Sequence, residues 1–144
     1  MKTFIAVTLL STIFGLALVS FKIFSNTLCQ DPMENMKKIG DACIEENKSS
    51  RKDFEDLAAG KLQAANAPDS MKCTVKCFME KNGFLDGAGG ELKADVLKAK
   101  LNDQANAENL EKAIASCKAL KGANPCDTAF QIMTCMWSNK IMKQ

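Results

Sequence analysis

Seven cysteines are the residues of this sequence whose type and spacing could do chemistry. They are Cys29, Cys43, Cys73, Cys77, Cys117, Cys126 and Cys135. In a chain of 144 residues, which is enough for one domain, so many cysteines predict a framework of disulfide bonds. Such a framework forms and lasts in an oxidising compartment, so the chain needs a route out of the cytosol.

The N-terminus carries the features of a secretory signal peptide. Lys2 is followed by an uncharged, mostly apolar run, 4–21, and then by a polar stretch. The run is long enough to span a bilayer, but its position at the start of the chain favours a cleaved signal. No later stretch is as long and as apolar. We therefore expect a secreted, extracellular protein, in which the sequon Asn47-Lys48-Ser49 is a candidate glycosylation site.

Two cleavage sites for this signal peptide fit the sequence equally well. Small residues precede a cut after Thr27 and a cut after Cys29 alike. The cut after Thr27 keeps Cys29, an odd thiol that could link two chains. We favour the cut after Cys29, because it leaves six cysteines in a mature domain, 30–144.

The residue types that are missing exclude several function classes. The sequence has no His and no Tyr, so the commonest general base and zinc ligand is absent. It also has no Gly-rich phosphate loop and no nucleophile elbow. We therefore expect no enzyme activity, no metal and no cofactor.

The charges of the mature chain are balanced. The 19 basic residues less Lys2 and Lys22, which leave with the signal peptide, equal the 17 acidic ones. This balance argues against a nucleic-acid partner. It also gives no support to charge steering toward a membrane surface.

The composition predicts an all-α fold of about six helices. Ala, Leu, Lys, Glu and Met dominate, β-branched residues are few, and no apolar–polar alternation persists. The expected helices are 32–47, from 50 onward, from 69 or 70 to Gly83, 91–101, 107–121 and 126–141, with a turn-rich loop at 84–90. The last helix is apolar on two faces, which is typical of a buried helix.

These helices have to position the cysteines, and their geometry removes some of the 15 pairings open to six cysteines. Cys126 and Cys135 are nine residues apart, or about 13 Å along a helix, whereas a disulfide needs Cα atoms within about 7 Å. They cannot pair if the helix is continuous, and they point to opposite faces. Cys73 and Cys77 share one helix face, where a bond between them would be awkward and would constrain nothing else. Geometry alone leaves several pairings open.

The full spacing is more specific than any pair. Between the six cysteines lie 29, 3, 39, 8 and 8 residues. This spacing resembles the six-cysteine signature of the insect odorant-binding proteins, the pheromone-binding and general odorant-binding group, over the whole mature chain. The resemblance implies pairs Cys43–Cys77, Cys73–Cys126 and Cys117–Cys135, each stabilising the fold by about 2–4 kcal/mol. Cys29 departs from the family pattern.

The resemblance also implies that the six helices, stapled by three disulfides, enclose an apolar cavity for odorants, pheromones or similar molecules. Candidate ligand-binding residues are Phe54, Leu57, Met71, Val75, Phe78, Met79, Phe84, Leu110, Ile114, Phe130, Met133, Trp137 and Ile141. Ordinary core packing is the alternative for each of them. A wall containing Met71, Met79, Met133 and Met142 would adapt to several ligand shapes.

The segment after Cys135 and the lack of His bear on how a ligand is held and released. In the family this tail can fold over the pocket mouth, so that Trp137, Ser138 or Asn139 could contact a ligand's polar group. Without His, no ordinary side-chain pKa falls between pH 5 and 8. We expect ligand binding to depend weakly on pH in that range, unless burial raises the pKa of a carboxyl group.

The favoured function is that of an extracellular carrier for small hydrophobic molecules. One alternative is a secreted protein of the same fold that carries or scavenges lipids or hormones outside olfaction. Another is a membrane-active, saposin-like lipid binder, which the charge balance and the cysteine spacing disfavour. Besides the apolar ligand, a chemosensory receptor is a candidate partner. We expect a monomer or weak homodimer without stable membrane insertion.

Overall fold

A computed structural model describes residues 32–59, 61–86 and 90–142. The chain divides into two compact units, 1–35 and 36–144. The hydrophobic core lies within the second unit. The expected signal peptide, 1–29, and Cys29 lie outside the described residues.

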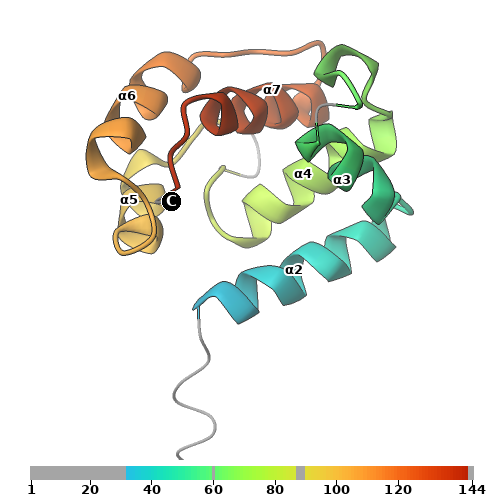
Figure 1. Cartoon of the computed structure of the whole chain (residues 1–144), viewed down its shortest axis with the longest axis horizontal. Helices are drawn as coiled ribbons and strands as arrows, with labels where there is room; N and C mark the ends of the chain where they lie inside the picture. Colours follow the sequence, from blue (N-terminus) through green and yellow to red (C-terminus); the bar gives the residue numbers. More distant parts are fainter. Residues whose placement is uncertain (1–31, 60, 87–89, 143–144) are drawn as a thin grey trace, which may run out of the picture. The chain divides into compact units, whose positions relative to one another are not determined.

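Six α-helices and one 3-10 turn make up the regular structure of the described residues, which confirms the all-α prediction. They are α2 (Pro32–Glu46), α3 (Arg51–Ala58), η1 (Ala64–Asn66), α4 (Asp69–Lys81), α5 (Ala94–Leu101), α6 (Ala107–Cys117) and α7 (Pro125–Ser138). In Figure 1, α5 and α6 lie together at the end of α7 that is away from α3.

Local sequence explains where several helices begin and end. The side chains of Asn106 and Asn124 accept hydrogen bonds from the first turns of α6 and α7, which is the usual capping role of asparagine. Helix α4 follows Pro68 and ends before Gly83, whose φ of 73° lies in the left-handed region. Gly83 therefore terminates this helix as the sequence predicts.

Three helices are shorter than their patterns predict, because contacts with residues outside the helix limit them. Helix α5 begins at Ala94 rather than at residue 91, since Leu92 bridges to Leu85 in an isolated β-bridge. Helix α7 ends at Ser138 rather than at 141, since the carbonyl of Ile141 accepts a hydrogen bond from the Asn106 backbone N–H.

Helix α6 likewise ends at Cys117 rather than at 121. The chain turns after this residue, because two side chains of α7 accept hydrogen bonds from backbone N–H groups of the segment between the helices. Thr128 accepts from the Gly122 N–H, and Asp127 accepts from the Ala123 N–H.

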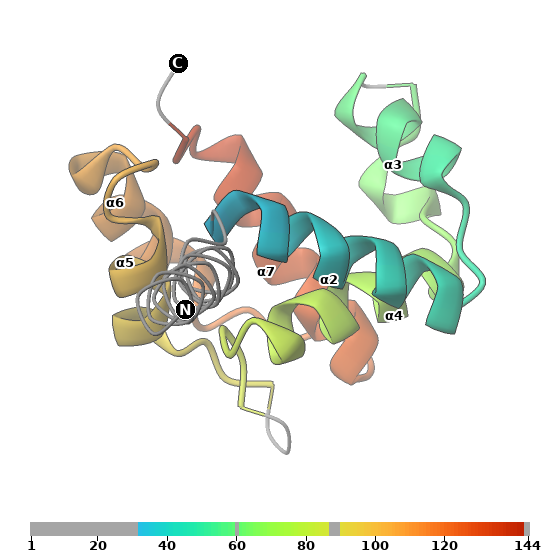
Figure 2. The same ribbon diagram turned by 90° about the horizontal axis from the view of Figure 1, so that it is seen from below.

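Helices α4 and α7 are the main packed pair of the core, and α6 packs on α7. The largest fully buried side chains at this centre include Met71, Met79, Ile132 and Met136. Figure 1 shows α4 between α2 and α7, and in Figure 2 α2 crosses in front of α7 with α4 beside it. Met36 of α2 also packs against the core.

Three disulfides join four of the helices in series. Cys43–Cys77 links α2 to α4, Cys73–Cys126 links α4 to α7, and Cys117–Cys135 links α6 to α7. Their Cα–Cα distances are 5.8, 4.5 and 5.8 Å, within the usual range. These are the pairs that the family resemblance implies, and the two cysteines of α7 reach two different neighbours.

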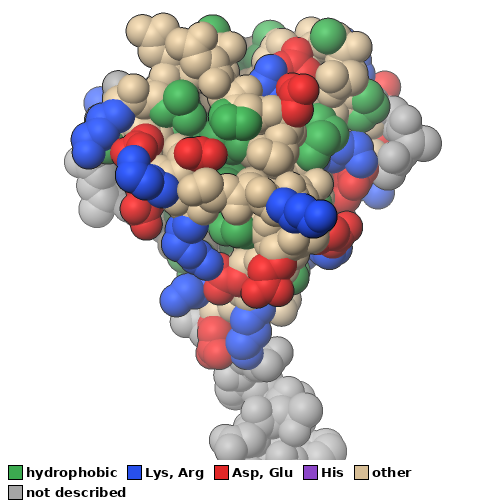
Figure 3. All heavy atoms as spheres, turned by 90° about the vertical axis from the view of Figure 1, so that its right-hand side faces the viewer, with side chains coloured by type: hydrophobic (Ala, Val, Ile, Leu, Met, Phe, Trp, Pro, Cys, Tyr) green, Lys and Arg blue, Asp and Glu red, His purple; other side chains and the backbone are tan. Residues whose placement is uncertain are grey.

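The surface carries mixed charges. Figure 3 shows acidic and basic side chains interspersed on one face, with hydrophobic side chains exposed among them. None of the helices in the described part of the chain is long and apolar enough to cross a bilayer.

Candidate ligand pocket

An apolar hollow of about 190 Å³ lies among α2, α3, α4 and α7. Its walls are formed by Gly40, Ile44, Phe54, Thr74, Val75, Phe78, Met133 and Trp137. None of these eight residues carries a charge. The hollow is therefore suited to an apolar, uncharged ligand.

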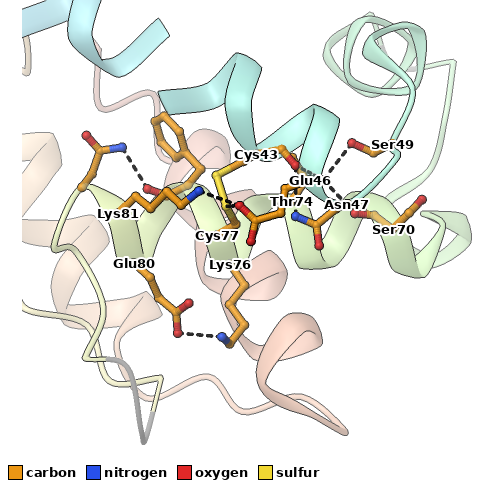
Figure 4. Close-up of a disulfide and its surroundings, with 12 residues drawn as sticks. Cys43, Glu46, Asn47, Ser49, Ser70, Thr74, Lys76, Cys77, Glu80 and Lys81 are labelled. Carbon is orange, nitrogen blue, oxygen red and sulfur yellow. Dashed lines mark hydrogen bonds and ion pairs between the residues drawn. A yellow bond between two sulfur atoms is a disulfide. The ribbon is translucent and has the colours of Figure 1, made fainter. Parts of the chain in front are cut away.

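The α2 wall of this hollow is fastened to α4 next to the cavity. Gly40 and Ile44 flank Cys43, which is fully buried and bonded to Cys77. Figure 4 shows this bond together with an ion pair from Lys81 Nζ to Glu46 Oε2, 2.6 Å long. The covalent bond and the ion pair hold α2 at a fixed distance from α4.

The α4 wall contains Thr74, a polar residue whose hydroxyl is already satisfied. Thr74 Oγ1 donates to the Ser70 carbonyl at 2.8 Å and is hydrogen-bonded to Ser49 Oγ at 2.7 Å (Figure 4). Both partners belong to the protein, so a buried hydroxyl costs little here. Thr74 therefore does not make the wall polar.

The most exposed wall residue of the hollow belongs to α7. Met133 is half-buried there, whereas Trp137 is 46% exposed although it lines the cavity. An aromatic side chain in contact with both solvent and cavity can cover a bound molecule. Trp137 is therefore placed to cover a molecule held in the hollow.

The hollow gathers some of the residues expected from the sequence and leaves others elsewhere. Phe54, Val75, Phe78, Met133 and Trp137 line it, and Leu57 is half-buried against the core. The remaining candidates are buried in the core away from the hollow: Met71, Met79, Phe84, Leu110, Ile114, Phe130 and Ile141.

The methionine wall expected from the sequence is not present around this hollow. Met133 alone of the four lines it, since Met71 and Met79 fill the core and Met142 is 43% exposed.

The polar residues after Cys135 are also engaged elsewhere. Ser138 Oγ donates to the Thr134 carbonyl, and Asn139 Nδ2 donates to the Cys135 carbonyl. Both side chains satisfy their own helix, and neither lines the hollow.

Sequence reasoning missed Gly40, Ile44 and Thr74 as wall residues. Ile44 belongs to the apolar stripe of its helix, so the pattern already placed it inward. Gly40 has no side chain for a periodicity to count. Thr74 is a polar residue, but its position between Met71 and Phe78 on one helix face was a usable signal.

A second, wider hollow of about 360 Å³ lies beside the Cys73–Cys126 bond. Asp69, Lys76 and Asn124 give it a polar wall. An apolar ligand gains little from such a surface, so the smaller apolar hollow is the better candidate site.

A carboxylate with a lowered pKa lies close to that second hollow, on α7. Lys72 Nζ donates to Asp127 Oδ1 at 2.9 Å, and the Ala123 N–H donates to Asp127 Oδ2 at 3.1 Å. These bonds favour the ionised form and lower the pKa of Asp127. In the described segments, no group of three or more His, Cys, Asp or Glu residues is placed to hold a metal.

The PBP/GOBP family model matches residues 26–139, which include all six paired cysteines. The chain belongs to this family, the insect odorant-binding proteins. The resemblance predicted from the cysteine spacing is thereby confirmed. Members of the PBP/GOBP family are non-enzymatic carriers of small hydrophobic molecules.

Individual relatives agree with this assignment. The chain is 31% identical to general odorant-binding protein 56a of Drosophila melanogaster over 116 residues, 81% of either chain. It is 32% identical to the structure of the fatty acid binding protein OBP56a from the oral disk of the blowfly Phormia regina. That match has a TM-score of 0.61 and covers 78% of this chain and 95% of the blowfly chain.

A more distant structure shows the fold alone. Odorant binding protein 7 from Anopheles gambiae has four disulfide bridges and is in complex with an azo compound. It is 20% identical to this chain, with a TM-score of 0.59 over 73% of this chain and 82% of that chain.

Proposed function

We propose that this PBP/GOBP protein is an extracellular carrier of odorants, pheromones or similar small neutral molecules. The observation that carries the proposal is the hollow of about 190 Å³ with no charged residue in its wall. An engineered cavity of about 150 Å³ in another protein binds benzene. A ligand of one ring or one short chain therefore matches the volume.

The extracellular location rests on two further observations. Three disulfides are stable in an oxidising compartment, and the apolar run 4–21 has the form of a signal peptide. A carrier in extracellular fluid would deliver its ligand to a chemosensory receptor.

The second candidate function is transport of lipids outside olfaction. The blowfly relative is named as a fatty acid binding protein from the oral disk, which favours this alternative. A long-chain acid differs from a small neutral ligand in two ways that the site can sense. It exceeds the volume of the hollow, and its carboxylate has no cation among the lining residues.

The membrane-active, saposin-like alternative has no observation in its favour. Neither the matched family nor the mixed charges of the surface support it.

The single tryptophan of the sequence offers a direct test. Because Trp137 lines the hollow and the chain has no Tyr, its fluorescence reports occupancy without a label. We expect a neutral ring compound, such as anisole, to change the emission with saturation. Palmitic acid should act only at higher concentration.

Each result of that titration has a defined meaning. Tighter binding of palmitic acid than of anisole would favour the lipid carrier. No saturable change with either compound would contradict both candidates. Expression in chemosensory organs rather than in glands or haemolymph would further separate an odour carrier from a lipid carrier.

A further inference from the structure

We propose that Gly40 determines the size of ligand that the pocket accepts. This inference rests on the proposed function, and it assigns a selectivity role to a residue that has no side chain.

Gly40 faces Phe78 across the hollow. A Cβ atom built on Gly40 would lie 3.8 Å from Phe78 Cδ2 and 4.0 Å from Phe78 Cε2. A methyl group there would make an ordinary contact with the ring. Any longer side chain would occupy the hollow itself, because both residues line it.

The α2 wall cannot move away to make room for such a side chain. Cys43, less than one helical turn after Gly40, is bonded to Cys77 of α4. Further along, Glu46 pairs with Lys81, and Ser49 is hydrogen-bonded to Thr74. Figure 4 shows these ties grouped around the disulfide. Added volume at Gly40 must therefore come from the ligand space.

The opposite wall is also restrained. The ring of Phe78 lies edge-on to Phe84, with 6.5 Å between centroids and an interplanar angle of 62°. Phe84 is 3% exposed and belongs to the core. Rotation of the Phe78 ring away from α2 would disturb this packed pair.

The backbone does not require glycine at this position. Gly83 and Gly90 are the described glycines with positive φ, and Gly40 is not among them. Glycine inside a helix is less stable than alanine, so its presence in the middle of α2 needs another reason. The space that it leaves beside Phe78 supplies that reason.

The test compares Gly40→Leu with Ala42→Leu. Ala42 is exposed on the same helix, so its variant adds the same bulk outside the pocket. The readout is Trp137 fluorescence with two neutral probes of one ring each, anisole and the larger 4-ethylanisole. Gly40→Leu should weaken binding of the larger probe by about tenfold or more. Ala42→Leu should change it by no more than about twofold.

A second variant keeps the inference testable if Gly40→Leu folds poorly. The double variant Gly40→Leu/Phe78→Ala removes the ring that faces the new side chain, and it should recover part of the lost affinity. Gly40→Ala adds only one methyl group, and it should weaken the larger probe more than anisole. Circular dichroism and a thiol count establish that each variant is folded and oxidised.

The outcomes separate this inference from the function on which it rests. If the unmodified protein binds both probes and Gly40→Leu binds them equally well, the selectivity role of Gly40 is wrong and the carrier function stands. If the unmodified protein binds neither probe, that result contradicts both the carrier function and this inference.

Discussion

At the scale of single residues, two glycines of this chain differ in the space available for a Cβ atom. A Cβ atom on Gly40 would make an ordinary contact with Phe78, whereas one on Gly122 would lie 2.4 Å from Asp127 Oδ2 and 2.7 Å from backbone atoms. The first position tolerates a methyl group and the second does not.

This difference predicts opposite effects on stability. Gly40→Ala should raise the free energy of unfolding by about 0.5–1 kcal/mol, because alanine favours the helical state. Gly122→Ala, the matched contrast, should lower it. Urea unfolding followed by circular dichroism measures both changes. A loss of stability in Gly40→Ala would contradict the ordinary contact described for that site.

The lowered pKa of Asp127 predicts where pH affects the fold. Because its pKa is below the unfolded value of about 3.9, the ionised group stabilises the folded state at higher pH. That contribution is lost as the pH falls through the lowered pKa. Stability should therefore change little between pH 8 and 5 and decline below about pH 4.

The measurement is urea unfolding across that pH range, with Asp127→Asn as the control. The variant should show a smaller decline in acid. Affinity for a fluorescent probe should differ by less than about tenfold between pH 7.4 and 5.0, because no His is present. A larger loss at pH 5.0 would mean that a carboxyl group with a raised pKa controls binding.

The residue pattern predicted the framework better than the pocket. Cysteine spacing can be read directly from the sequence, because each cysteine is a potential partner in a disulfide bond. Gly40 carries no such signal, since an apolar periodicity counts only side chains. Thr74 is a polar residue, which does not predict a place in an apolar wall. Its hydroxyl is satisfied by Ser70 and Ser49, and the sequence alone does not reveal these partners.

At the scale of elements, α2 depends on one covalent bond more than the other helices do. Among its described residues beyond Met36, Cys43 is the fully buried one. The Cys43–Cys77 bond, the Glu46–Lys81 ion pair and a hydrogen bond from the Ser49 segment hold it to α4. The pocket wall that contains Gly40 and Ile44 depends on these ties.

Removing that bond should affect binding more than removing another. The Cys43→Ser/Cys77→Ser variant should lose about 3 kcal/mol of stability and most of its affinity for anisole. The control, Cys117→Ser/Cys135→Ser, removes the α6–α7 bond, which is outside the pocket. It should lose comparable stability and keep its affinity. Equal loss of affinity in both variants would show that α2 has no special role.

Helix existence was predictable from composition, whereas helix length was not. The residues at 91–93 and at 139–141 fit a helical pattern, but Leu92 pairs with Leu85, and the Ile141 carbonyl with the Asn106 N–H. Asn106 is far from Ile141 in sequence, so no local window contains that pair, and a helical periodicity gives no signal for the bridge between Leu85 and Leu92.

At the scale of the whole molecule, the disulfides connect α2, α4, α7 and α6 in series. The packed centre lies between α4 and α7, and the hollow lies where α2 and α3 meet that pair. A periodicity identifies the inward face of each helix. It cannot distinguish an inward side chain that packs against another helix from one that lines a cavity. For this reason, seven of the residues expected to line the pocket are found in the packed core.

The expected cleavage of the signal peptide predicts the mass of the secreted protein. Intact-mass analysis of the secreted protein should give residues 30–144 with six cysteines oxidised in three bonds. A chain that begins at Leu28 and keeps Cys29 would place the cleavage site earlier and make a disulfide-linked dimer the expected form. Native mass spectrometry of the same sample reports any bound ligand.

The central claim is that the hollow beside Gly40, Phe78 and Trp137 holds the ligand. A crystal structure of the protein soaked with bromobenzene tests it most directly, because bromine scatters anomalously and a single ring fits about 190 Å³. We predict one strong anomalous peak among α2, α3, α4 and α7. A peak beside the Cys73–Cys126 bond instead, or side chains filling the hollow with no bromine present, would contradict the account.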